Sequence, residues 1–171
     1  MTGKKMMIAW MLALAAAGFC GGTEPLKGDA AEWLRRPLAD GQAVIWYLGH
    51  SGYAVKTKSK LLIFDYVDNL PVRNMDPVEA PARRSLDNGW IDPEEFKDLS
   101  VVVFVSHRHE DHYDKIIEEW RKAVPDIHYV FGWEESSDER HHSLSGPRSS
   151  LFQDGKKLQV WTVNSHHSDV P

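Results

Sequence analysis

Short hydrophobic runs separated by turn-forming residues follow one another along most of the chain, and they predict a protein rich in β-strands. The first three runs hold many β-branched and aromatic residues and are joined by tight turns such as Gly49–Gly52, so we expect three antiparallel strands side by side. The run Val101–Val105 has no polar position, which is typical of a strand covered on both faces. The expected strands are Gln42–Leu48, Tyr53–Thr57, Leu61–Phe64, Val101–Val105, Ile127–Phe131 and Leu158–Val163.

Helical spacing of hydrophobic residues is limited to short stretches between these strands. Ala30–Leu38 predicts a short helix that a proline interrupts. A second helix is indicated after Asp92, because the aspartate can cap it and Pro93 suits its first turn. In His112–Ala123, Trp120 and two isoleucines share one helical face. The polar segments 69–89 and 136–150 are predicted to be loops, the second of them exposed with solvated His141 and His142.

The first 22 residues have the pattern of an export signal. Lys4 and Lys5 precede the apolar stretch Ile8–Phe19, and small residues follow it. This stretch is shorter than the roughly 20 residues that cross a bilayer, so we expect no stable membrane span after cleavage. Attachment of a lipid at Cys20 and a buried or anchoring helix are the alternatives. We therefore expect an exported protein, periplasmic or extracellular.

Composition narrows the class of protein further. Of the 171 residues, 42% are hydrophobic and 26% are charged, which is ordinary for a globular chain. The net charge of −5 argues against nucleic-acid binding, which requires a basic surface. The single cysteine excludes an intrachain disulfide. We divide the chain into a signal peptide at 1–22, an N-terminal helical segment at 23–41 and one domain at 42–171.

Histidines supply the most informative chemistry in the sequence. The chain has nine of them, and three fall between Ser106, which ends the predicted buried strand, and Tyr113. Alternate side chains of an extended backbone share a face, so His107 and His109 can converge on one point. Asp111 and His112 follow at the expected start of a helix. Imidazoles with a carboxylate are ligands for zinc or another first-row metal, so we predict a metal site here.

The pattern His-x-His-x-Asp-His over residues 107–112, directly after a hydrophobic strand, resembles the metal signature of the metallo-β-lactamase fold superfamily. Two upstream stretches, Tyr47–Tyr53 and Leu61–Tyr66, are similar to the opening hairpin of its lactonase-like and uncharacterised bacterial branches. The resemblance spans Val44 to Pro171. It implies an α/β (α+β) fold, a four-layer αββα sandwich that is incomplete at the carboxyl end, with 42–171 as a partial domain of this kind.

The resemblance also implies a ligand set for a first metal ion. His107, His109 and a later histidine would hold it. The later histidine should follow the strand Leu158–Val163, where two histidines stand together. We favour His167 because a His-Ser pair is common at this point in similar proteins, and His166 is the alternative.

A second metal ion and its surroundings are implied in the same way. Asp111 and His112 would contribute to this second site, with Asp111 also as the catalytic residue that orients the nucleophile. Asp65 would support the ligands from behind, since a carboxylate that accepts the other N–H of an imidazole fixes its tautomer. His50 has two interpretations, as a residue lining the pocket behind the ligands or as an ordinary turn residue.

The activity implied by the resemblance is zinc-dependent hydrolysis of a small-molecule substrate. One or two Zn²⁺ ions, or other first-row metals, would lower the pKa of bound water towards about 7, and the hydroxide would attack an ester, lactone, amide or phosphoester. The family pattern continues with a bridging aspartate and a last histidine, whereas only four residues follow His167. The alternative is therefore a non-catalytic metal-binding fragment that lacks these ligands. The sequence predicts neither the substrate nor the oligomeric state.

Overall fold

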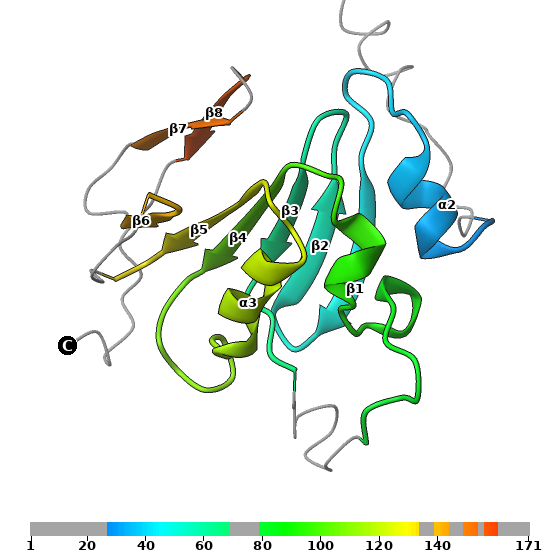
Figure 1. The fold of residues 1–171 in the computed structure, drawn as a ribbon, viewed down its shortest axis with the longest axis horizontal. Helices are drawn as coiled ribbons and strands as arrows, with labels where there is room; N and C mark the ends of the chain where they lie inside the picture. Colours follow the sequence, from blue (N-terminus) through cyan, green and yellow to red (C-terminus); the bar gives the residue numbers. More distant parts are fainter. Residues whose placement is uncertain (1–26, 69–78, 134–138, 144–148, 154–155, 161–171) are drawn as a thin grey trace, which may run out of the picture.

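The computed structural model describes residues 27–68, 79–133, 139–143, 149–153 and 156–160 (Figure 1). The predicted signal peptide with Cys20 lies outside these residues, as do both candidate ligands His166 and His167. Among the described residues, no helix combines the length and the apolar character needed to cross a membrane.

A six-stranded mixed sheet forms the centre of the molecule, with its strands side by side in chain order (Figure 1). The first three strands are antiparallel neighbours as predicted, and the next three continue the sheet in parallel. An antiparallel hairpin forms a second, two-stranded sheet. The strands are β1 (Val44–Gly49), β2 (Gly52–Lys56), β3 (Leu61–Phe64), β4 (Val101–Val105), β5 (Ile127–Phe131), β6 (His141–Ser143), β7 (Ser149–Gln153) and β8 (Lys156–Val160).

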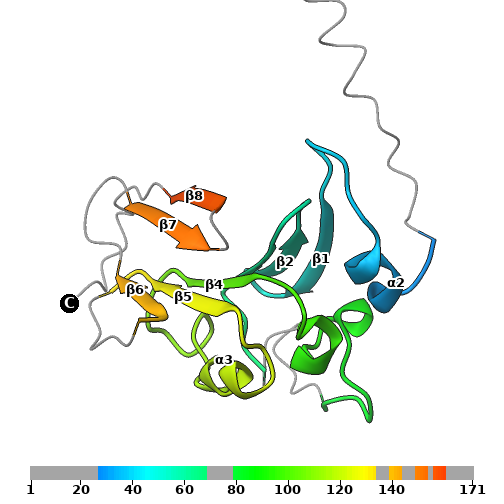
Figure 2. The ribbon, with the colours of Figure 1, turned by 45° about the horizontal axis from the view of Figure 1, so that its top comes forward.

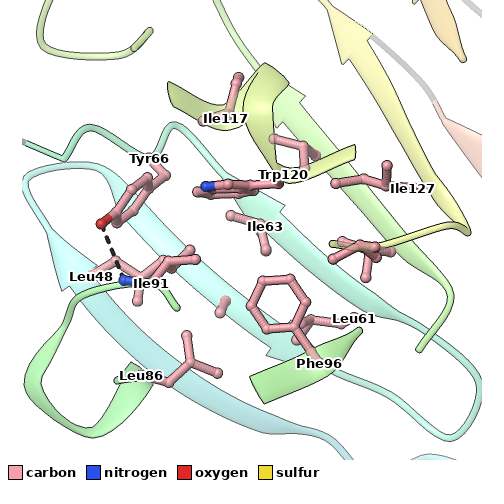
Figure 3. Packing of buried hydrophobic residues seen from close by; sticks show 14 of the residues in the cluster. Leu48, Leu61, Ile63, Tyr66, Leu86, Ile91, Phe96, Ile117, Trp120 and Ile127 are labelled. Carbon is pink, nitrogen blue, oxygen red and sulfur yellow. Dashed lines mark hydrogen bonds between the residues drawn. The ribbon is translucent and has the colours of Figure 1, made fainter. Parts of the chain in front are cut away.

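In the described part of the chain the helices are few and short, and the fold is therefore of the mixed α+β type. They comprise α2 (Ala30–Arg35), α3 (Ile116–Glu119) and the 3₁₀ segments Leu86–Asn88, Pro93–Phe96 and Trp120–Lys122. They lie on one face of the sheet (Figure 2). Their buried side chains belong to the main core cluster together with residues of the strands. In Figure 3, Ile117 and Trp120 lie above Ile63 of β3, and Phe96 lies beside Leu61 of the same strand. Burying each such side chain contributes about 1.5–3 kcal/mol.

The helix predicted over His112–Ala123 is shorter in the structure. The backbone amides of His112 and Tyr113 both donate to the carbonyl of His109, at 2.9 Å each, so the chain turns tightly before it can form a helix. The side chain of Asp114 then accepts from the amide of Ile116, and α3 begins there. The predicted buried face of the helix is confirmed, since Ile117 and Trp120 are buried.

The predicted exposed loop at 136–150 is wrong in two places, since β6 and the start of β7 lie within it. Strand β6 pairs in parallel with β5 and brings His141 opposite Tyr129. The ring of His141 stacks on that tyrosine at 5.0 Å, and only 9% of its side chain is exposed. His142 is half-buried, and burial, followed by the nearness of His128 and His141, lowers its pKa. Neither histidine is solvated as expected, because strand pairing covers both.

The other face of the sheet is also apolar. Val102 and Val130 are buried there against Leu158 and Val160 of β8, and the hairpin β7–β8 lies on this side (Figure 2). The rings of Phe64 and Phe104 stack on the same face, 4.9 Å apart. Towards β1 the face is open to solvent, and the exposed fractions are 62% for Ile45, 54% for Tyr47 and 43% for Tyr53.

A buried polar network ties the chain after β3 to the 3₁₀ segments. The Tyr66 hydroxyl donates to Asp68 at 2.9 Å and accepts from the backbone amide of Ile91 at 3.1 Å (Figure 3). Arg84 pairs with the same carboxylate, and the Asp68 amide donates to Asp114 at 3.2 Å. Burial raises the pKa of Tyr66, so its hydroxyl stays protonated and acts as donor and acceptor together.

Replacing Tyr66 by phenylalanine is expected to lower the free energy of unfolding by about 1–3 kcal/mol, because the buried Ile91 amide loses its acceptor. Urea denaturation followed by circular dichroism measures this change. The matched control is Tyr53→Phe on the exposed face, where we expect a change within about 0.5 kcal/mol. Equal losses in both variants would contradict a stabilising role for the network.

Candidate metal centre

One edge of the sheet gathers the carboxyl ends of four strands. Strands β1 and β3 are both antiparallel to β2 and therefore run in the same direction, and β4 and β5 are parallel to β3. The residues that follow these four ends are His50, Asp65, Ser106 and Gly132. The topology thus brings segments that are far apart in the sequence to one edge, which is where open α/β sheets commonly bind ligands.

The backbone at this edge is unusual at two residues. His50 and Asp65 have φ angles of 44° and 42°, and they are the non-glycine residues with positive φ in the described part of the chain. Such conformations cost free energy and gather at functional sites. At Asp65 the amide is held by a hydrogen bond to the carbonyl of Phe104, at 2.9 Å. The fold therefore fixes both side chains in directions that an ordinary strand end would not give.

Asp65 is the centre of a hydrogen-bond network beneath the histidines. Its carboxylate accepts from the backbone amide of Ser106 at 2.7 Å and from the hydroxyl of Ser106 at 2.8 Å. A further contact of this carboxylate is to Nδ1 of His112, at 3.0 Å. Both side chains of this last pair are largely buried, with 14% and 17% exposed. A carboxylate at Nδ1 favours the proton there, which leaves Nε2 of His112 as the ligand atom.

A first group of three side chains lies directly after β4. The ligand atoms of His107, His109 and Asp111 all lie within 4.8 Å of one another. Nε2 of His107 lies 3.2 Å from Nδ1 of His109. Nδ1 of His107 lies 2.9 Å from the hydroxyl of Ser106, so this nitrogen faces the network and Nε2 faces the group. These three residues could hold one metal ion.

A second group shares Asp111 with the first. The ligand atoms of His50, Asp111 and His112 also lie within 4.8 Å of one another. One carboxylate oxygen of Asp111 is 3.2 Å from Nε2 of His50 and 3.7 Å from Nε2 of His112. The two groups are adjacent, since the rings of His107 and His112 are 4.1 Å apart. The edge therefore presents two neighbouring positions for a cation with one carboxylate between them.

The electrostatics keep this shared carboxylate ionised. Burial raises the pKa of Asp111, but a hydrogen bond from its own backbone amide and the nearby His112, His50 and His107 outweigh that effect, and the net pKa lies below the ordinary value. Imidazole and carboxylate are ligands that suit zinc and other first-row divalent metals. If a zinc ion were bound, three protein ligands in each group would leave a coordination position for water or substrate.

Six of the residues proposed from the sequence lie together at this edge. The position of one of them differs from the prediction. His50, expected behind the ligands or in a simple turn, lies beside Asp111 as part of the second group. Asp65 lies behind the histidines as expected. The residues placed together are His50, Asp65, His107, His109, Asp111 and His112.

Two serines of the site were missed from the sequence. The Ser106 hydroxyl contacts Asp65 and His107, and the Ser51 hydroxyl lies 3.1 Å from Nδ1 of His112. A signal for Ser106 was present, because it stands between a buried strand and the first histidine. No comparable signal marked Ser51, since its contact with His112 depends on the tertiary fold.

An aromatic platform borders the site on the β5 side. Trp133 stacks on Phe131 with ring centroids 4.6 Å apart and meets Tyr113 edge-on at 5.2 Å, so Tyr113 and Trp133 are packing residues. The guanidinium of Arg108 lies 5.3 Å over the ring of Trp133, a cation–π contact. Arg108 is exposed and stands between His107 and His109, so a positive charge lies next to the candidate metal centre.

No protein-family model matches the chain, and a search of the curated proteins finds no significant match.

Proposed function

We propose that this chain carries the zinc centre of a hydrolase of the metallo-β-lactamase fold superfamily. The observation that supports this best is the Asp111 carboxylate shared between two three-residue groups at the carboxyl edge of the sheet. Two adjacent cation positions with a bridging carboxylate suit the attack of water on a carbonyl or phosphoryl centre. An ester, lactone, amide or phosphoester of a small molecule is the substrate class that we propose.

In this proposal each residue of the site has a separate task. His107 and His109 would hold the first ion, and His50 and His112 would hold the second. By the family resemblance, His167, or alternatively His166, would complete the first site. When bound, zinc would lower the pKa of water from 15.7 to about 7 and polarise the substrate. Asp111 reaches both positions and would accept a hydrogen bond from the nucleophile, which orients it. Asp65 holds His112 in the tautomer that a metal ligand requires.

The proposed four-layer αββα sandwich is supported by the unequal coverage of the sheet. Helices cover one face, while the hairpin β7–β8 packs on part of the other. The rest of that second face carries Ile45, Tyr47 and Tyr53, whose apolar surface would suit a further covering layer. Export to the periplasm or the extracellular space belongs to the same proposal and has its support in the sequence of residues 1–22.

The proposal predicts that His109→Ala lowers the zinc content of the purified chain by about one equivalent, because this histidine supplies one of three close ligands. Mass spectrometry of the metal after dialysis against a weak chelator measures this. The matched control is Glu110→Gln, which changes an exposed neighbour that belongs to neither ligand group. Equal zinc in the His109→Ala variant and the unaltered chain would remove the site assignment.

Activity distinguishes the hydrolase from the alternative of a non-catalytic metal-binding chain. The zinc-loaded protein is assayed with a chromogenic ester, a lactone and a phosphodiester, beside the Asp111→Asn variant. We expect hydrolysis of at least one substrate and a fall of 100-fold or more, roughly, in the variant, which retains the side-chain volume but loses the charge. Bound zinc without hydrolysis of any substrate would favour the non-catalytic alternative.

A further inference from the structure

We propose that His128 and His142 form a separate metal site, away from the candidate metal centre, which binds a divalent transition-metal cation and links the edge strand β6 to β5. The two residues lie on neighbouring parallel strands, and the register pairs His142 with Val130, two positions after His128. Since alternate residues of a strand share a face, both imidazoles project from the same side of the sheet. Nothing in the proposed hydrolytic centre requires this pair, so the inference stands independently of that function.

The distance between the two imidazoles fits chelation of one ion. Nδ1 of His128 lies 3.1 Å from Nε2 of His142, and the rings are nearly parallel, at 21°. With zinc–nitrogen bonds of about 2.0–2.1 Å, two nitrogens of one ion are roughly 2.9 Å apart at a right angle and roughly 3.4 Å apart at the tetrahedral angle. The observed separation lies between these values. The separation of the two nitrogens is therefore that of two ligands of one ion.

A carboxylate is placed to orient one of the two ligands. Oδ1 of Asp126 lies 3.9 Å from Nε2 of His128, whereas the other ring nitrogen, Nδ1, is the one next to His142. At 3.9 Å this contact is electrostatic and not a hydrogen bond, and the negative charge favours the proton on Nε2, which leaves Nδ1 unprotonated next to His142. The side chain of His128 is 23% exposed, so an ion with its remaining water ligands can reach it from solution.

The competing explanation is a simple hydrogen bond between the two imidazoles, in which a proton occupies the place of the ion. Strand β6 has only three residues and forms the edge of the described sheet. A metal ion bound to both imidazoles would therefore hold β6 against β5 more firmly than one hydrogen bond. Two imidazole ligands favour Cu²⁺, Ni²⁺ and Zn²⁺ over calcium or magnesium, which prefer oxygen. The expected occupant is therefore a borderline transition-metal cation held by two histidines and water.

The test is calorimetric titration with Ni²⁺ alone at pH 7.5, on the unaltered chain and on His128→Asn and His142→Asn. Asparagine can keep one hydrogen bond to the remaining imidazole, so β6 can still pair while chelation is lost. We expect one binding event to disappear in both variants. Asp126→Asn should retain the event with an affinity lowered roughly tenfold, since it affects only the orientation of His128.

A second measurement separates this site from the candidate metal centre. The double variant His109→Ala, Asp111→Asn disrupts both ligand groups there and should keep the event that the His142→Asn variant loses. Saturating Ni²⁺ should raise the thermal midpoint of this double variant by roughly 5 °C, and adding His142→Asn should abolish the rise. Unchanged binding in His142→Asn, or loss of the event in the double variant, would overturn the proposal.

Discussion

The Gly132→Ala variant is expected to lose about 3 kcal/mol of its free energy of unfolding, because an alanine methyl has no space at this position. A Cβ atom on Gly132 would lie 2.0 Å from the carbonyl oxygen of Ser106 and 2.9 Å from its carbonyl carbon. Both are backbone atoms, and the amide of Gly132 is hydrogen-bonded to the carbonyl of Val105 at 2.9 Å. Only a separation of the ends of β4 and β5 could relieve the clash.

Urea denaturation of this variant is compared with that of Gly41→Ala. Gly41 has a φ of 79°, and among the described residues no atom beyond its two chain neighbours lies within 4 Å of the place that a methyl group would take. Alanine there carries the conformational cost of about 1–2 kcal/mol without a clash. The difference between the two variants isolates the close approach of the strand ends. Since Ser106 directly precedes His107, Gly132→Ala should also weaken zinc binding. A loss no greater than that of Gly41→Ala would contradict this account.

Removal of the Asp65 carboxylate is expected to lower the zinc affinity of the protein by about 10–100-fold, although Asp65 is not among the proposed ligands. The Asp65→Ala variant leaves the amide and hydroxyl of Ser106 and Nδ1 of His112 without this acceptor. Freed from the carboxylate, the ring of His112 can rotate or change its tautomer. Competition with a chromophoric chelator measures the affinity, and circular dichroism checks that the variant is folded.

Asp65→Asn is the matched variant that separates charge from backbone conformation. Asparagine tolerates the left-handed φ of 42° and can still accept the hydrogen bond from the Ser106 amide, whereas alanine does neither. We therefore expect an affinity between those of Asp65→Ala and the unaltered chain. If both variants bind zinc as the unaltered chain does, Asp65 has no supporting role at the site.

The strands and the central residues of the site were predictable because their signals are local. The run Val101–Val105 is apolar at each position. It forms β4, whose side chains are covered on both faces of the sheet. The alternation of side chains along an extended backbone was enough to predict that His107 and His109 converge, and they do. The placement of Asp111 beside both of them came from the structure. Patterns of this kind can be interpreted from the sequence because they depend only on residues that are close together in the chain.

Other features depended on contacts that the sequence does not record. His50 reaches Asp111 because β1 ends at the same edge as β4, which follows from the strand order and not from the residues around the turn. Strand β6 has three residues and a polar sequence, so only its pairing with β5 identifies it. Likewise, the helix at 112 is delayed because residues 107–115 curve around the site instead of continuing α-helical hydrogen bonds.

The strand order also predicts in which order the parts of the candidate metal centre come together during folding. Strands β1, β2 and β3 pair through short turns, whereas Leu61 of β3 pairs with Val101 of β4, far along the chain. Contacts between distant residues form late because closing a long loop is entropically costly. His50 and Asp65 belong to the early hairpins, and His107 follows the late strand. The candidate metal centre would therefore be complete only after the slow parallel pairing, close to the end of folding.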